Sequence, residues 1–160
     1  MGIYNAATVK SKLEPLDGME PFQLTPEGHV MQLANYLFFT TVCEQALAFY
    51  AACGLGEVTE LKRYGRDGKP PTEAMDGKVM HARFEGPGVL FYASDNHDAE
   101  PMRGSAHILM LEDRGETERL FGHLADGGAV TTALAIQPWG DYYGKLTDRF
   151  GVQWMLNCRL

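Results

Sequence analysis

The two halves of the chain repeat one pattern, and this repeat constrains the fold more than any other feature. In each half a strand-like segment is followed by a helix-like segment and then by three more strand-like segments. One offset of 72 residues aligns three apolar positions of the first half with three of the second: Leu37, Phe39 and Phe49 with Leu109, Leu111 and Phe121. The repeat therefore predicts two β-α-β-β-β modules.

Residue patterns give the expected bounds of these elements. The first half is predicted to form strands at 33–39, 57–62, 79–84 and 89–93 and a helix at 43–53, with a Gly- and Pro-rich connection at 63–78. The second half is predicted to form strands at 107–111, 130–135, 143–147 and 152–157 and a helix at 115–125. Gly54 and Gly127 follow the two helices, where glycine commonly ends a helix.

The domain organisation follows from these segments. Residues 1–31 show no period and contain three prolines, so they are predicted to be an N-terminal extension over the core, which could also cover a partner subunit. The remaining residues, 32–158, form the predicted domain, with modules at about 32–95 and 104–158. A chain of 160 residues leaves no room for a second independent domain.

Charge and cysteine content limit the partners and the compartment. A formal net charge of −7 argues against nucleic acid or an anionic membrane as the main partner, because phosphate groups favour basic surfaces. No run of about 18 apolar residues is present. Three cysteines without a C-x-x-C pair indicate reduced thiols, and no signal-like segment opens the chain, so we expect a cytoplasmic protein.

Six short motifs occur in an order that is typical of one family. They are YLFF at 36–39, CEQALAFY at 43–50, VMHA at 79–82, SD at 94–95, WGDYYG at 139–144 and TDRFGVQW at 147–154. Over about residues 33–158 the chain thus resembles the PhnB-like branch of the vicinal oxygen chelate superfamily, which includes glyoxalases, bleomycin-resistance proteins and dioxygenases. The motifs are specific for the family and not for a substrate.

The resemblance implies an α+β fold in which each module forms a curved mixed sheet. Two modules, from one chain or from two, then enclose a ligand cavity. Catalytic relatives hold one divalent metal there through His and Glu side chains, and the metal acts as a Lewis acid on neighbouring substrate oxygens. Manganese, iron, nickel or zinc would suit such ligands.

The family's ligand positions carry over poorly to this sequence. They correspond to Asn35, to Phe91 or Tyr92, to His107 and to Met155, of which only His107 is a strong metal ligand. The resemblance therefore predicts no conventional metal site, and no cofactor is assigned. A divalent metal held by an altered set around His81 and His107 remains the alternative.

The candidate ligand-binding residues combine these positions with nearby imidazole and aromatic side chains: Asn35, His81, Phe91, His107, Trp139, Tyr143 and Met155. We expect His81, His107, Trp139 and Met155 to line one mostly apolar cavity. The alternative for both histidines is a packed strand residue, and for the aromatic residues it is packing in a core or hairpin. No catalytic residue is assigned, and Cys43 at a helix start is interpreted as a packed residue rather than a nucleophile.

Three functions compete. The first is a homodimer that binds a small molecule without a metal, as antibiotic-sequestering relatives do. The second is a metal-dependent lyase, isomerase or dioxygenase, and the third is an interaction or structural role. The methyltransferase name sometimes attached to the family gains no support, because no glycine-rich nucleotide loop follows a strand. The ligand, and whether any reaction is catalysed, stay open.

Overall fold

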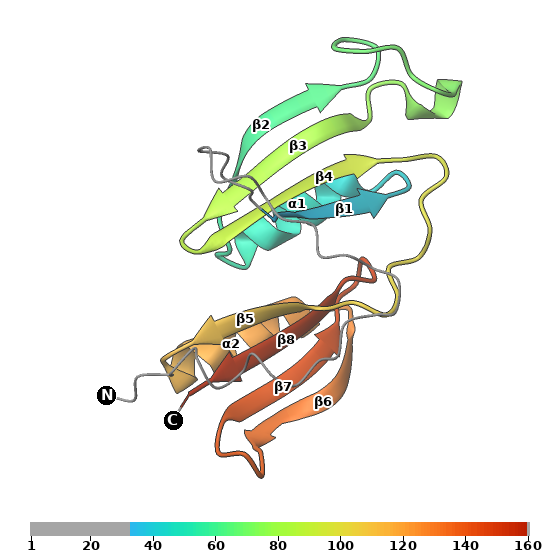
Figure 1. Ribbon diagram of the computed structural model, residues 1–160. Coiled ribbons are helices and arrows are strands. Elements are labelled where there is room, and N and C mark those ends of the chain that lie inside the picture. Colours follow the sequence, from blue (N-terminus) through green and yellow to red (C-terminus); the bar gives the residue numbers. More distant parts are fainter. Residues whose placement is uncertain (1–32, 160) are drawn as a thin grey trace, which may run out of the picture. The chain divides into compact units, whose positions relative to one another are not determined.

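The computed structural model describes residues 33–159, which form two modules with the same order of strands and α-helix (Figure 1). The predicted N-terminal extension lies outside the described residues. The first module comprises β1 (Asn35–Phe39), α1 (Cys43–Ala52), β2 (Glu57–Arg63), the short 3-10 helix η1 (Glu73–Met75), β3 (Val79–Gly86) and β4 (Val89–Asp95). The second comprises β5 (His107–Leu111), α2 (Arg114–Ala125), β6 (Ala129–Ile136), β7 (Tyr142–Thr147) and β8 (Gln153–Cys158).

Each module builds one four-stranded mixed sheet. The strand orders are β1-β4-β3-β2 and β5-β8-β7-β6. In each sheet the first strand pairs in parallel with the last, and the other pairs are antiparallel. The predicted α+β fold with two β-α-β-β-β modules is confirmed. Within residues 33–159, neither helix is long and apolar enough to cross a lipid bilayer.

The helix α1 is held at its start by a buried carboxylate from another strand. Asp95, at the end of β4, is 1% exposed and accepts a hydrogen bond from the Cys43 backbone N–H at 2.9 Å. Its second oxygen accepts from the Val79 N–H at 3.1 Å. The Asp95 side chain thus accepts from a backbone N–H at the helix start that has no partner within the helix, and it also fixes the start of β3. This explains the Ser-Asp motif at 94–95 as a structural element.

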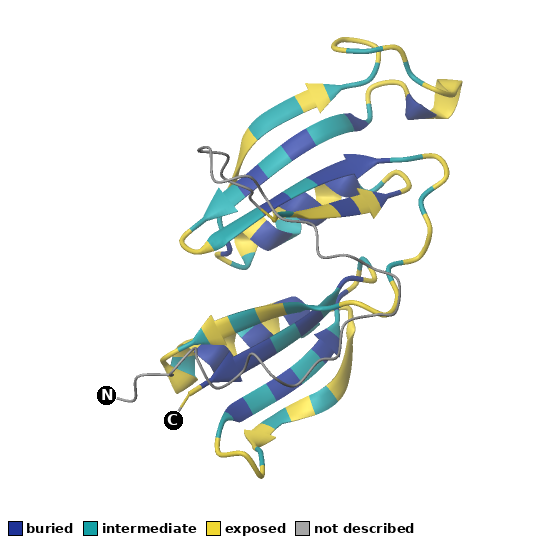
Figure 2. Cartoon of the chain, in the orientation of Figure 1, coloured by how far each residue is buried: buried dark blue, intermediate teal, exposed yellow. Residues whose placement is uncertain are grey.

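Side chains of both modules form one hydrophobic cluster. It contains Leu37 and Phe84 of the first sheet, Leu47 and Tyr50 of α1 and Leu124 of α2, together with residues of the second sheet. Figure 2 shows buried positions alternating with intermediate or exposed ones along several strands, as expected for sheets covered on one face. Only one face of each sheet therefore contributes to this cluster.

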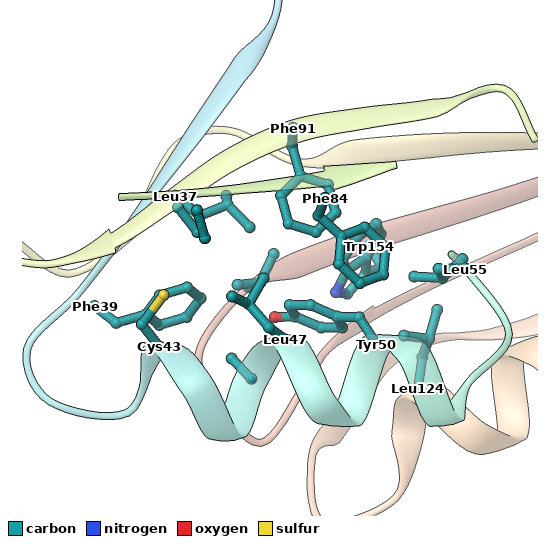
Figure 3. Packing of buried hydrophobic residues seen from close by; sticks show 14 of the residues in the cluster. Leu37, Phe39, Cys43, Leu47, Tyr50, Leu55, Phe84, Phe91, Leu124 and Trp154 are labelled. Atoms are coloured by element: carbon teal, nitrogen blue, oxygen red, sulfur yellow. The ribbon is translucent and has the colours of Figure 1, made fainter. Parts of the chain in front are cut away.

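A buried carboxylate also ties α1 to the second module. Asp148 accepts a hydrogen bond from the Tyr50 hydroxyl at 2.8 Å, and the Tyr50 and Trp154 rings lie 5.5 Å apart (Figure 3). The same oxygen accepts from Trp154 Nε1 at 2.9 Å. The other oxygen accepts from the Phe150 and Val152 backbone N–H groups at 2.8 and 3.0 Å. Asp148 is fully satisfied, so the motif at 147–154 is also structural.

Candidate functional site: an aromatic face on the first sheet

Among the helices of the described residues, none lies against one face of the first sheet. Along β1, Leu37 and Phe39 are buried against the helix, whereas Tyr36 and Phe38 are 39% and 44% exposed. Neighbouring strands in register place Tyr92 beside Tyr36 and Arg83 beside Tyr92. We call Tyr36, Phe38, His81, Arg83 and Tyr92 the aromatic face.

The aromatic rings of this face pack closely against one another. Tyr36 and Phe38 are stacked with centroids 4.8 Å apart and an interplanar angle of 25°. His81 and Tyr92 are stacked at 5.5 Å and 26°. The Tyr36 hydroxyl lies 3.1 Å from Nδ1 of His81, so a hydrogen bond links the two pairs. Such a surface can stack on a flat ligand and still offers the other ring nitrogen of His81 for hydrogen bonding.

Arg83 gives this face a cation that the sequence analysis missed. Its Nη2 donates to Glu85 Oε1 at 2.7 Å, and the side chain is 39% exposed. Its position two residues after His81 could have indicated that both side chains lie on one face, because residues i and i+2 of a strand share a face. The signal was weak, since nothing in the sequence shows which face lacks a helix.

His107 lies on the helix-covered side of the second sheet. At the start of β5 it pairs with the buried Trp154, with ring centroids 5.1 Å apart. The Asn35 side-chain amide donates to Nδ1 of His107 at 3.0 Å, so these two repeat-related residues join the modules. Burial lowers the pKa of His107 below its ordinary value of 6.5, and the charge of Asp148 opposes this shift. His107 therefore holds a neutral ring at a module junction.

The lowered pKa of His107 makes the stability of the folded chain depend on pH. The unfolded chain takes up a proton on His107 below about pH 6.5, whereas the folded chain resists it. The contribution of His107 to stability is thus complete above that pH and is lost as the pH falls through the lowered folded-state pKa. In urea unfolding at about pH 7.5 and about pH 5, we expect His107→Asn to show a smaller acid loss of stability than wild type. The matched variant His123→Asn, on the exposed surface of α2, should behave like wild type; equal acid losses in all three proteins would refute the assignment.

The other predicted residues divide between the core and the second sheet. Phe91 is 4% exposed and stacks on Phe84 at 4.7 Å, which makes it a core residue. Met155 is half-buried and lies next in register to Ile108 and Lys145. Trp139 is 61% exposed.

In the part of the chain that the structure describes, the Met155 side of the second sheet also has no helix packed on it. We call Ile108, Met110, Tyr143, Lys145 and Met155 the second open face; the strand register places them on one side of the sheet. Ile108 and Met110 are 51% and 61% exposed. The ring of Trp139 packs edge-on against Tyr143, with centroids 5.8 Å apart. This face is therefore largely apolar, and no helix within residues 33–159 lies on it.

Within one chain, the structure does not bring the expected cavity together. His81 lies on the aromatic face of the first sheet, and His107 on the helix-covered side of the second. Met155 and Trp139 belong to the second open face and its edge. The repeat aligned Asn35 with His107. It did not show that each of them lies two residues before a core position of its strand, and so on the face that carries the helix.

Three recesses in the described part of the chain include none of the seven predicted site residues in their linings. The largest, of about 800 Å³, lies between residues 53–55, the 87–89 turn, β5 and α2. A second, of about 520 Å³, is bordered by residues 38–42, 99–103 and the β7–β8 turn. Residues 33–159 contain no group of three or more His, Cys, Asp or Glu side chains placed to hold a metal ion. Burial raises the pKa of the Cys43 thiol, which disfavours a thiolate nucleophile.

Comparisons with known proteins agree on one family. The family described as 3-demethylubiquinone-9 3-methyltransferase matches residues 31–157. Protein YjdN of Escherichia coli is 28% identical over 139 residues, which cover 79% of this chain and 95% of YjdN.

Solved structures extend this agreement to the fold. Protein PA1353 from Pseudomonas aeruginosa is 36% identical, with a TM-score of 0.74, and the match covers 81% of this chain and 98% of that one. A Bacillus cereus PhnB protein, described as a putative 3-demethylubiquinone-9 3-methyltransferase, is 26% identical with a TM-score of 0.69, over 80% and 99% of the two chains. A bleomycin resistance determinant encoded on transposon Tn5 shares the fold at 15% identity, with a TM-score of 0.52 over 81% and 98%. The chain therefore belongs to the PhnB-like family, whose model is described as 3-demethylubiquinone-9 3-methyltransferase, and it has the fold of glyoxalase/bleomycin resistance/dioxygenase proteins.

Proposed function

We propose that this protein binds a small molecule on the aromatic face of its first sheet. The observation that carries the proposal is the stacked and hydrogen-bonded group of Tyr36, His81 and Tyr92, which no helix of the module covers. The core of this module lies on the other face of the sheet, where the helix packs. Aromatic side chains on the open face do not contribute to that core and can instead stack on a ligand. His81 provides a polar group among the rings and so can orient the ligand.

We further propose that a second copy of the chain closes this site. The second open face exposes Ile108 and Met110, a surface that self-association would remove from water. Placed over the aromatic face of another copy, it would bring Met155 and Tyr143, with Trp139 at its edge, to the ligand. The predicted site residues would then meet between copies instead of within one chain.

The remaining predicted residues receive supporting roles in this proposal. Phe91 packs the core, and the Asn35–His107 hydrogen bond joins the modules. Binding without a metal is preferred to metal-dependent chemistry, because the aromatic face offers His81 as its one imidazole and the neighbouring carboxylates of Glu60 and Glu85 are already paired with Lys62 and Arg83. We place the protein in the cytoplasm, where thiols stay reduced; Cys43, Cys53 and Cys158 are all free.

Calorimetric titration with two flat aromatic compounds, 2-naphthoate and 2-naphthamide, tests the site. Wild type should bind at least one of them with a dissociation constant of roughly tens of micromolar. Removing a stacking ring in Tyr36→Ala should weaken that binding by about tenfold.

The matched control is Tyr64→Ala, which truncates a half-buried tyrosine in the β2–β3 connection of the same module. It should bind like wild type, because Tyr64 does not belong to the aromatic face. Absence of binding of both compounds to wild type, or unchanged affinity in Tyr36→Ala, would refute the proposed site.

A further inference from the structure

Arg83 occupies a defined place on the aromatic face. It lies on β3 directly beside Tyr92 of β4, and on its other side it pairs with Glu60 of β2. Residues paired in this way have Cβ atoms about 5 Å apart. The guanidinium group is therefore within reach of any molecule that stacks on the Tyr92 ring.

The hydrogen bonds of Arg83 are incomplete. A guanidinium carries five N–H donors, of which Nη2 donates to Glu85. The second oxygen of Glu85 accepts from the Thr59 hydroxyl at 2.7 Å, so this carboxylate is shared. Nε of Arg83 is buried without a hydrogen-bond partner, the only such side-chain atom found within residues 33–159. An unsatisfied buried donor is uncommon and costs free energy. Within residues 33–159, only Nη2 of the guanidinium group has a hydrogen-bond acceptor.

The neighbouring charges do not supply an acceptor for the other donors of Arg83. Glu60, the carboxylate opposite Arg83 in the register, forms an ion pair with Lys62 at 2.8 Å. His81, two residues away on the same face, is engaged by Tyr36 through Nδ1. Arg83 thus retains donors for a group that comes from outside the chain.

We infer that the ligand of the aromatic face is a planar aromatic carboxylate, whose ring stacks on Tyr36 and Tyr92 and whose carboxylate binds Arg83. The inference rests on the proposed function and names its ligand class. A carboxylate conjugated to a ring lies near the plane of that ring, and it matches the planar donor fork of a guanidinium. Tyr36 and Phe38, which are 39% and 44% exposed, offer aromatic surface to such a flat ligand.

The two naphthyl compounds separate charge from shape, because 2-naphthamide keeps the ring and the planar substituent but has no negative charge. Wild type should bind 2-naphthoate roughly tenfold more tightly than 2-naphthamide. Arg83→Gln should bring the two affinities within about twofold of each other, and Arg83→Lys should retain part of the preference. Arg119→Gln, an exposed arginine of α2, is the control and should keep the full preference.

Each outcome decides between the two claims. Equal affinity of wild type for both compounds would overturn the carboxylate ligand and leave the small-molecule site standing. Binding of neither compound to wild type would overturn the proposed site and the ligand class together. A preference for 2-naphthoate that persists in Arg83→Gln, with its circular dichroism spectrum like that of wild type, would overturn the role of Arg83.

Discussion

Replacing Asp148 with alanine is expected to lower the free energy of unfolding by about 4 kcal/mol or more. The carboxylate is 4% exposed and accepts four hydrogen bonds, two from backbone N–H groups and two from the side chains of Tyr50 and Trp154. Its removal leaves these donors buried without partners, at about 1–3 kcal/mol for each that water cannot reach. The loss should be visible as a lower midpoint in urea unfolding.

Two variants make this measurement specific. Asp148→Asn keeps the shape and one oxygen, so it should cost less than Asp148→Ala. Asp126→Ala removes a carboxylate from an exposed pair with Arg149, and it should cost no more than about 1 kcal/mol. If Asp148→Ala is no more destabilising than Asp126→Ala, the proposed tie between α1 and the β7–β8 turn is wrong.

Gly56→Ala is the second change for which we expect a large effect, a destabilisation of about 3 kcal/mol or more. Gly56 lies between α1 and β2 with φ +150°, and a Cβ atom there would come within 2.1 Å of the Glu85 carbonyl oxygen. The three nearest atoms, the Glu85 carbonyl oxygen and carbon and the Gly86 Cα, all belong to the backbone, so the end of β3 would have to move. Thermal unfolding of the variant should show a correspondingly lower midpoint.

Gly54 provides the matched control two residues earlier. Its φ is +83°, but a Cβ atom would meet nothing within 4 Å. Gly54→Ala should therefore cost only the strain of the left-handed conformation, about 1 kcal/mol. Equal effects of the two substitutions would show that steric contact with β3 is not what requires glycine at position 56.

The fold could be predicted because its signals are local and repeated. Alternating apolar residues gave the strands, and Gly54 at φ +83° and Gly127 at φ +72° end the two helices as expected. The motifs containing Asp95 and Asp148 identified the family, but their structural roles join segments far apart in the chain. The Cys43–Asp95 and Tyr50–Asp148 hydrogen bonds span 52 and 98 residues, and no local pattern shows such partners.

The candidate site was predicted less completely, because its residues depend on which face of a sheet is covered. His81 was chosen for its imidazole and lies on an open face, whereas His107 was chosen by the repeat and lies against the core. A shift of one residue along a strand changes the face, so an alignment of the two halves cannot settle this choice. Tyr36 and Arg83 join His81 only through strand register, which the sequence does not specify.

The central claim is that one copy's aromatic face and another copy's second open face form each binding site. It is tested most directly with a mixed dimer of a Tyr36→Ala chain and a Met155→Glu chain, isolated through two different affinity tags and titrated with 2-naphthoate. Each parent homodimer should bind weakly, because both of its sites are altered. The mixed dimer should regain one site of wild-type affinity per dimer, since one of its two sites then combines unaltered faces. Recovery of no mixed dimer, or a mixed dimer that binds as weakly as its parents, would contradict the shared site.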